Sequence, residues 1–167
     1  MNYHDIKKCD MLNGDGIRVS LWMAGCEHNC DQCQNPQTWD VNGGLSFDEI
    51  VEEELFESLN KPYISGITFT GGDPLHENNL QDVLNLVNKI RLLLPEKTIW
   101  LYSGYTWEAI MDDAKRREIV LNCDVLIDGQ YIDEQRDITL KWRGSPNQRV
   151  IDVKQSIADN QLKLHTE

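Results

Sequence analysis

The sequence predicts an α/β fold, an open half-barrel of parallel strands with flanking helices. Strand-like and helix-like segments alternate along the chain, which is typical of βαβ units and a parallel sheet. A turn rich in cysteine, glycine or acidic residues follows each of the first four expected strands. The chain has 167 residues, whereas a complete TIM-type barrel typically needs about 250. We therefore expect a single domain over residues 1–167 that builds part of such a barrel.

The first half of the chain predicts two strands with a helix between them. Residues 17–23 form the first expected strand, which ends just before a cysteine-rich loop. Ser46 with Glu49 three residues later is a capping-box pattern, and it predicts a helix that runs to about Leu59. Residues 66–70 are β-branched and aromatic, so a second strand is expected there.

The second half continues the alternation. A helix that ends at Pro95 is predicted by apolar residues at spacings of three and four, namely Leu80, Val83, Leu84, Val87, Ile90 and Leu94. Another helix is expected over residues 106–120. The remaining expected strands cover residues 98–102, 124–129 and 149–153. The residues from about Ser156 onward are polar, and we expect them to be loose at the end.

Composition excludes several classes of protein. The formal net charge of −12 argues against a nucleic-acid binder, whose phosphate contacts need a basic surface. Mean hydropathy is −0.50, and no apolar run approaches the roughly 20 residues of a membrane helix. The N-terminus lacks the apolar segment of a secretion signal. These observations predict a cytoplasmic protein that binds neither membrane nor nucleic acid.

Three of the five cysteines lie on one short loop. Cys26, Cys30 and Cys33 have the spacing C-x3-C-x2-C, and a glycine precedes the first of them. Without an export signal, metal binding explains such a group better than disulfide bonds. Cys9 and Cys123 stand apart, and we expect each to be a small buried residue.

The triplet fits an iron–sulfur cluster better than a zinc ion. Three thiolates can hold three irons of a 4Fe–4S cluster and leave the fourth iron open to another ligand. His28 could complete a Cys3His zinc site, but Cys26, His28 and Cys30 would then crowd three ligands into five residues. The spacing favours the cluster, and zinc stays open as the alternative.

The turns after the later strands are candidate ligand sites. Gly71 and Gly72 allow close approach of the backbone to a ligand, and the carboxylate of Asp73 can accept hydrogen bonds from an ammonium group. Taken alone, these residues also suit a plain strand-to-helix turn. Trp142–Ser145 can likewise be a ligand contact or a polar turn. His4 and His76 are more typical of structural or solvated histidines.

At these residues the sequence resembles the radical S-adenosylmethionine (SAM) superfamily, which combines this cysteine triplet with a Gly-Gly-acid turn one strand later. The likeness is closer still to the activating proteins of anaerobic ribonucleoside-triphosphate reductases, and it covers nearly the whole chain. The segments that carry it are residues 13–16, 35–39, 70–75, 100–105, 128–129 and 142–148.

The resemblance implies a half-barrel radical SAM fold, a site and a reaction. The implied ligands of one 4Fe–4S cluster per chain are Cys26, Cys30 and Cys33. The implied SAM contacts are the backbone of Gln32, Cys33 and Gln34 beside the adenosyl group, Gly71, Gly72 and Asp73 at the methionine moiety, and Ser103. Reductive cleavage of SAM would give methionine and a 5′-deoxyadenosyl radical, which would take a hydrogen from a glycine of the reductase's large subunit. A flavodoxin-type protein is the expected electron donor.

Several positions depart from the family pattern. Relatives often have an aromatic residue where Gln32 or Gln34 stands, proline at position 15, and a basic residue at position 130, where this chain has Gln130. These changes affect the expected packing of adenine and remove a basic SAM contact. They leave the cysteines and the Gly-Gly-Asp turn intact. The other class of function left open is a non-catalytic zinc- or cluster-binding interaction module.

Overall fold

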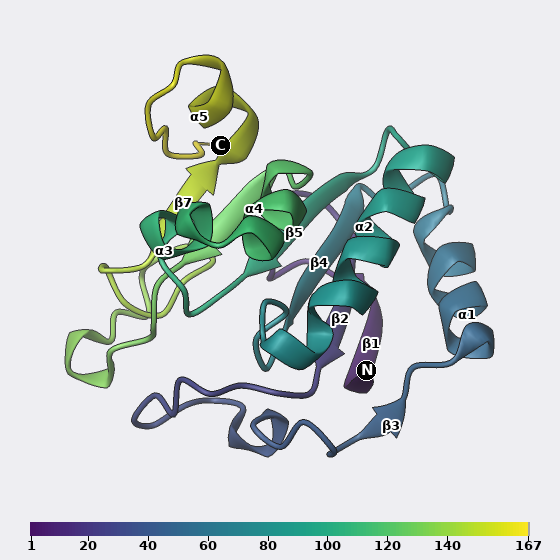
Figure 1. Cartoon of the computed structure of the whole chain (residues 1–167), viewed down its shortest axis with the longest axis horizontal. Coiled ribbons are helices and arrows are strands. Elements are labelled where there is room, and N and C mark those ends of the chain that lie inside the picture. The colour runs from purple at the N-terminus through teal and green to yellow at the C-terminus, as the bar shows by residue number, and fades with distance from the viewer. Residues whose placement is uncertain (167) are drawn as a thin grey trace.

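A seven-stranded sheet organises the chain in the computed structural model, which describes residues 1–166. Its strands lie in the order β3-β1-β2-β4-β5-β6-β7 (Figure 1). Their bounds are β1 (Asn2–Asp10), β2 (Arg18–Met23), β3 (Leu45–Ser46), β4 (Gly66–Gly71), β5 (Thr98–Tyr102), β6 (Val125–Asp128) and β7 (Arg149–Asp152). The central strands β2, β4, β5 and β6 run parallel, and β1, β3 and β7 pair antiparallel with their neighbours. The sheet is open, as the predicted part-barrel requires.

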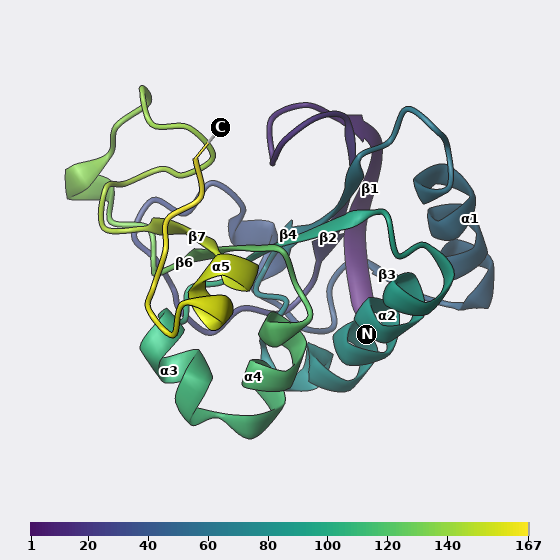
Figure 2. The same ribbon diagram turned by 90° about the horizontal axis from the view of Figure 1, so that it is seen from above.

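Helices cover one face of this sheet, as Figure 2 shows most clearly for α1, α2 and α4. The helices are α1 (Glu49–Leu59), α2 (Leu80–Leu93), α3 (Trp107–Asp112), α4 (Ala114–Leu121) and α5 (Val153–Ala158). The main core lies between this layer and the sheet. Its strand residues include Leu21, Phe69 and Leu101, which are fully buried against helix residues such as Leu55 and Val87. No helix within residues 1–166 is both long and apolar enough to cross a bilayer.

The opposite face of the sheet carries polar and aromatic residues because side chains alternate along each strand. Arg18 is fully buried there, and its guanidinium donates to Thr68 Oγ1 and Thr98 Oγ1, both at 2.9 Å. It lies over the Trp100 ring, 5.3 Å from the ring centroid. Burial lowers the pKa of Arg18 to about 10, so the side chain stays charged at neutral pH. Hydrogen bonds to hydroxyl and carbonyl oxygens therefore solvate a buried cation.

Two differences from the sequence-based elements lie near the N-terminus. Strand β1 precedes the expected first strand and pairs with it. It was not predicted because most of its residues are polar, as suits a strand that is largely accessible to solvent. The cap of α1 is Asp48, whose side chain accepts from the Val51 amide at 3.0 Å. Ser46, the predicted cap, instead belongs to β3. The helix itself is confirmed through Leu59.

A single helix was expected over residues 106–120, and this prediction is wrong because the segment forms two helices, α3 and α4. Asp113 interrupts it with extended backbone angles, and its carboxylate accepts from the Arg116 amide at 2.9 Å. A carboxylate that satisfies a free N–H in this way starts a new helix. Thr106 caps α3 as its side chain accepts from the Ala109 amide.

The C-terminal segment packs on the sheet as far as His165, so the expected looseness is wrong up to that residue; residue 167 lies outside the described part of the chain. Helix α5 runs to Ala158, and Leu164 forms a bridge with Ile151 of β7. His165 Nε2 lies 2.7 Å from Asp15 Oδ2, and its ring lies edge-on to Trp100 with centroids 5.1 Å apart. These contacts join the two ends of the sequence.

Asp124 is expected to stabilise the fold in a pH-dependent way. Burial raises the pKa of its carboxyl, but hydrogen bonds from Lys154, the Ile99 amide and Arg91 outweigh burial and hold the pKa below its usual value. We expect Asp124→Asn to lower the free energy of unfolding by about 2 kcal/mol at pH 7. The charged form is the stabilising one, so the difference should shrink as the pH falls below about 3.9, the usual pKa of aspartate. Urea unfolding of both proteins at pH 7 and pH 3 measures this, and an equal difference at both pH values would contradict it.

Candidate functional site

The C-terminal ends of the parallel strands meet at one cavity of about 350 Å³. Met23 and Gly71 are paired in register, so the loops after β2 and β4 leave the sheet at the same level. The turns after β5 and β6, at Ser103 and Gly129, line the same cavity. This volume lies within the range of about 300–1,000 Å³ that is common for small-molecule sites. The predicted convergence of the strand-end turns is therefore confirmed.

All three cysteines of the loop line this cavity. Burial raises the pKa of the Cys26 thiol to about 12 and also raises the pKa of Cys30. Among residues 1–166, no three His, Cys, Asp or Glu side chains are grouped so as to hold a single metal ion. A 4Fe–4S cluster requires a different arrangement, since each thiolate binds a separate iron. The donor set, three thiols on the wall of one cavity, fits such a cluster.

Gly71 and Gly72 are needed for the close approach of β4 to the cysteine loop. Gly71 has φ +99°, and a Cβ there would lie 2.4 Å from the Met23 nitrogen. A Cβ on Gly72 would lie 2.5 Å from the Gly25 carbonyl oxygen. The Gly72 amide donates to the Met23 carbonyl at 2.8 Å, and the Asp73 amide to the Gly25 carbonyl at 2.7 Å. Both glycines also line the cavity, so the turn is a structural junction with a face open to a ligand.

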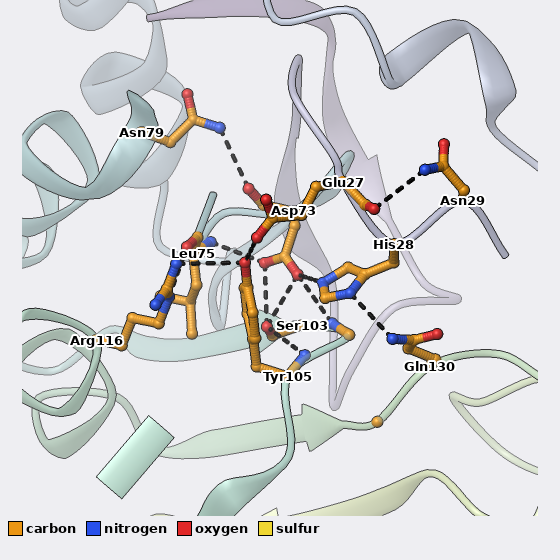
Figure 3. A network of polar contacts seen from close by, with 12 residues as sticks. Glu27, His28, Asn29, Asp73, Leu75, Asn79, Ser103, Tyr105, Arg116 and Gln130 are labelled. Carbon is orange, nitrogen blue, oxygen red and sulfur yellow. Dashed lines mark hydrogen bonds and ion pairs between the residues drawn. The ribbon is translucent and has the colours of Figure 1, made fainter. Parts of the chain in front are cut away.

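Asp73 is buried, and its carboxylate accepts hydrogen bonds from four groups (Figure 3). Ser103 Oγ lies 3.0 Å from both carboxylate oxygens, and the Leu75 and Gly104 amides donate at 2.8 and 2.9 Å. His28 Nε2 lies 2.6 Å from Oδ2. One carboxylate thus joins the cysteine loop, the end of β4 and the end of β5.

The two glutamines of the cysteine loop lie differently with respect to the cavity. Both are exposed, but Gln34 lines the cavity, whereas Gln32 is not among the described lining residues. Gln32 also has φ +54°, a left-handed conformation that side chains other than glycine seldom adopt. Cys33 between them accepts a hydrogen bond on its sulfur from the Asn35 amide. Of the residues expected near the adenosyl group, Cys33 and Gln34 therefore face the cavity.

Residues 142–148 prove to be both a cavity wall and a structural turn. Trp142, Arg143 and Gly144 line the cavity. Gln148 donates to the Gly129 carbonyl at 3.1 Å and accepts from the Gly144 amide at 2.9 Å. These contacts hold the segment against the end of β6. The segment is therefore a polar turn that also leaves Trp142, Arg143 and Gly144 on the cavity wall, where they can contact a ligand.

Sequence reasoning missed several residues that hold the site together. Asn79 is fully buried, and its amide donates to the carbonyls of Ala24 and Asp73 at 2.9 and 3.2 Å. Tyr105 hydrogen-bonds Glu27 of the cysteine loop, and Arg116 lies over the Tyr105 ring at 4.2 Å. Tyr105 lies in the segment 100–105 that carries the family resemblance, and this was the available signal for it. For Asn79 there was none, because its burial is visible only in the structure.

The isolated cysteines and histidines have varied environments. Cys123 is buried as expected, but Cys9 is exposed, so its expected burial is wrong. The cause is its position on β1, whose residues are mostly accessible to solvent. His76 Nδ1 accepts from the Asn78 amide at 3.2 Å and caps a short helical turn, which is the structural role expected for it.

Comparison with known proteins supports the cluster interpretation. Residues 12–151 match the family model described as a 4Fe–4S single cluster domain. The chain therefore carries a domain of the class that holds one iron–sulfur cluster, and the matched range includes the cysteine loop and β2 through most of β7.

Three relatives specify the class further, and all are named anaerobic ribonucleoside-triphosphate reductase-activating protein. The relative from Enterobacteria phage T4 is 43% identical over 90% of this chain and 93% of its own length. The relative from Escherichia coli K12 is 41% identical over 90% of this chain and 97% of its own. The relative from Haemophilus influenzae is 39% identical over 89% of this chain and 96% of its own length. The chain belongs to the family of anaerobic ribonucleoside-triphosphate reductase-activating proteins.

Proposed function

We propose that this chain activates an anaerobic (class III) ribonucleoside-triphosphate reductase. It does so by generating a glycyl radical on the large subunit of that enzyme through reductive cleavage of SAM. The observation that carries the proposal is the single cavity that three cysteines share with the Gly71–Asp73 turn and Ser103. A protein that bound metal for structure alone would not need a cavity of this size beside the cysteines.

Cys26, Cys30 and Cys33 are the proposed ligands of one 4Fe–4S cluster. Three thiolates account for three irons and leave the fourth iron for the amino and carboxylate groups of SAM. The thiols lose their protons when they bind iron, and the burial that raises the pKa of Cys26 disfavours the free thiolate. Before the cluster is inserted, the protonated form of Cys26 is therefore the stable one.

The proposed SAM contacts lie along the cavity wall. Gly71, Gly72 and Asp73 would receive the methionine end, Ser103 lies beside them, and Cys33 and Gln34 face the space left for the adenosyl group. The Asp73 carboxylate already accepts from four groups, and the Gly72 and Asp73 amides donate to Met23 and Gly25. The ligand would therefore approach the face of the Gly71–Gly72 backbone that lines the cavity. Gln32 would contribute through its main chain, since its side chain is exposed.

When bound, a cluster held by Cys26, Cys30 and Cys33 would supply the electron for reductive cleavage of SAM, and SAM would supply the group that accepts a hydrogen atom from a glycine Cα. The chain would position these groups along the cavity wall. We further propose a cytoplasmic location, where the nucleotide substrates of such a reductase are found. A flavodoxin-type protein is the proposed source of the electron.

The proposed function is tested by looking for the radical itself. Reduced, cluster-loaded protein is mixed anaerobically with SAM and a class III reductase, and EPR spectra are recorded. We expect a glycyl radical that requires SAM and is absent when SAM is left out. A second mixture replaces the glycine that carries the radical in the reductase with alanine, and it should give no signal. Formation of 5′-deoxyadenosine without a glycyl radical would contradict the reductase as partner.

A further inference from the structure

His28 lies in the middle of the cysteine loop, yet its side chain is directed into the protein. Only 7% of the side chain is exposed, and Nε2 lies 2.6 Å from Asp73 Oδ2 (Figure 3). The ring packs edge-on against Tyr105, with centroids 4.6 Å apart. A histidine flanked by Cys26 and Cys30 is thus bonded to the turn that follows a different strand.

The end of β5 is shaped to receive this ring. A Cβ on Gly104 would lie 2.4, 2.5 and 2.7 Å from three atoms of the imidazole, closer than real side chains approach. The φ angle of Gly104 is not in the left-handed region, so glycine is needed here for space. The Gly104 amide also donates to Asp73 Oδ2 at 2.9 Å. Ring, carboxylate and glycine therefore form one packed unit.

Both nitrogens of the His28 ring have partners. An aspartate carboxylate only accepts, so Nε2 is the nitrogen that carries hydrogen. Nδ1 then accepts from the side-chain amide of Gln130, whose nitrogen lies 3.3 Å away. In this arrangement neither nitrogen offers a lone pair to a metal, so His28 does not complete a Cys3His zinc site. Gln130, which departs from the family pattern, has a defined role as the partner of His28.

The position of His28 matters because side chains join this part of the cysteine loop to the ends of the strands. Glu27 is hydrogen-bonded by Tyr105, and His28 donates to Asp73. Asn29 and Gln32, with φ of 49° and 54°, bend the backbone between the cysteines. The bond from His28 to Asp73 ties the middle of the cysteine loop to the Gly71–Asp73 turn, whereas the backbone bond from the Asp73 amide to the Gly25 carbonyl ties only the start of the loop.

We propose that His28 is a positioning residue for SAM cleavage: its bond to Asp73 holds the cysteine loop in register with the turn that receives the methionine end of SAM. The inference rests on the proposed function. SAM must bind an iron and the turn together, so an error in their relative position weakens both contacts. A misplacement of about 1 Å in such a site can cost on the order of 100-fold, and residues that orient metal ligands typically contribute about 10–100-fold.

The test compares His28→Phe, His28→Asn and His28→Gln in the full-length protein, reconstituted anaerobically with iron and sulfide. Phenylalanine keeps the ring and loses the donor, and asparagine keeps an amide that is too short to reach Asp73. Glutamine places its amide nitrogen near the position of Nε2. The measurements are iron and sulfide content, the melting temperature, and the SAM concentration that half-saturates the change in the EPR spectrum of the reduced cluster.

We expect His28→Phe and His28→Asn to need about 10–100 times more SAM than the parent. Their cluster content and melting temperature should stay close to the parent's, and His28→Gln should recover most of the loss. If replacement by phenylalanine prevents folding, the asparagine and glutamine variants still decide the question. Loss of iron from the asparagine variant would instead indicate a role in holding the cluster, and it would overturn the positioning role for SAM.

Other outcomes overturn the inference in distinguishable ways. Parent-like SAM titration of the phenylalanine and asparagine variants would refute the positioning role, as would equal loss in all three variants. If the parent itself takes up a cluster but shows no spectral response to SAM, the proposed function is contradicted, and the role of His28 that rests on it is contradicted too. If the parent and the variants all respond equally to SAM, the positioning role of His28 is refuted while the proposed function stands.

Discussion

Cys30→Ala is expected to abolish reductive SAM cleavage, the largest single effect we foresee. The variant keeps two cysteines on the wall of the cavity, whereas a site-open 4Fe–4S cluster needs three thiolates. Formation of 5′-deoxyadenosine should fall below detection, and iron content after reconstitution should fall with it. Both are measured on anaerobically reconstituted protein with dithionite and SAM, by chromatography and by iron and sulfide analysis.

Cys9→Ala is the matched control for this experiment. It removes the same thiol from an exposed position on β1, outside the cavity lining, so it should keep the parent's cluster and activity. Retained 5′-deoxyadenosine formation in Cys30→Ala would count against the assigned cluster ligand. If the parent instead takes up one zinc ion tightly and no iron or sulfide, a non-catalytic zinc-binding module becomes the better description.

Gly71→Ala is expected to disrupt the site through the backbone alone. The new Cβ would meet the Met23 nitrogen at 2.4 Å and the Met23 oxygen at 2.8 Å, and φ at this position is +99°. Backbone strain of about 1–2 kcal/mol and overpacking of about 1–3 kcal/mol predict a loss of roughly 2–5 kcal/mol in unfolding free energy. Separation of the ends of β2 and β4 should also lower SAM affinity. Denaturant unfolding and SAM titration measure the two effects.

Gly129→Ala separates the two causes. Gly129 has a similar φ of +93°, but a Cβ there would meet its nearest atom at 3.7 Å, an ordinary contact. It should therefore show the backbone strain and none of the overpacking. Equal destabilisation by the two substitutions would show that contact with β2 is not what makes Gly71 necessary.

The parallel part of the fold was open to prediction because its signals are local. Residues 66–70 and 98–102 are β-branched and aromatic, and the apolar spacing from Leu80 onward is that of a helix. Parallel strands bring their C-terminal ends to one edge, so the cysteine loop, the Gly-Gly-Asp turn and Ser103 had to meet there. The location of the candidate site followed from topology, with no knowledge of side-chain contacts.

The contacts inside the site were not predictable in the same way. His28 and Asp73 are 45 positions apart, and neither residue type signals the other. Strand β1 carries few apolar residues, so its pairing with β2 left no pattern to find. The break at Asp113 depends on one hydrogen bond, from the Arg116 amide to the Asp113 side chain. The helical propensity of the surrounding residues concealed this local effect in the sequence.

The shared carboxylate of Asp73 has a consequence for how the cavity opens. The Leu75 and Gly104 amides follow different strands, yet both donate to Asp73. A local fluctuation that withdraws this carboxylate frees both amides and the His28 ring at once, so these segments share one opening free energy. We therefore expect the parts of the cysteine loop and of the ends of β4 and β5 that contact Asp73 to open together, as one cooperative unit.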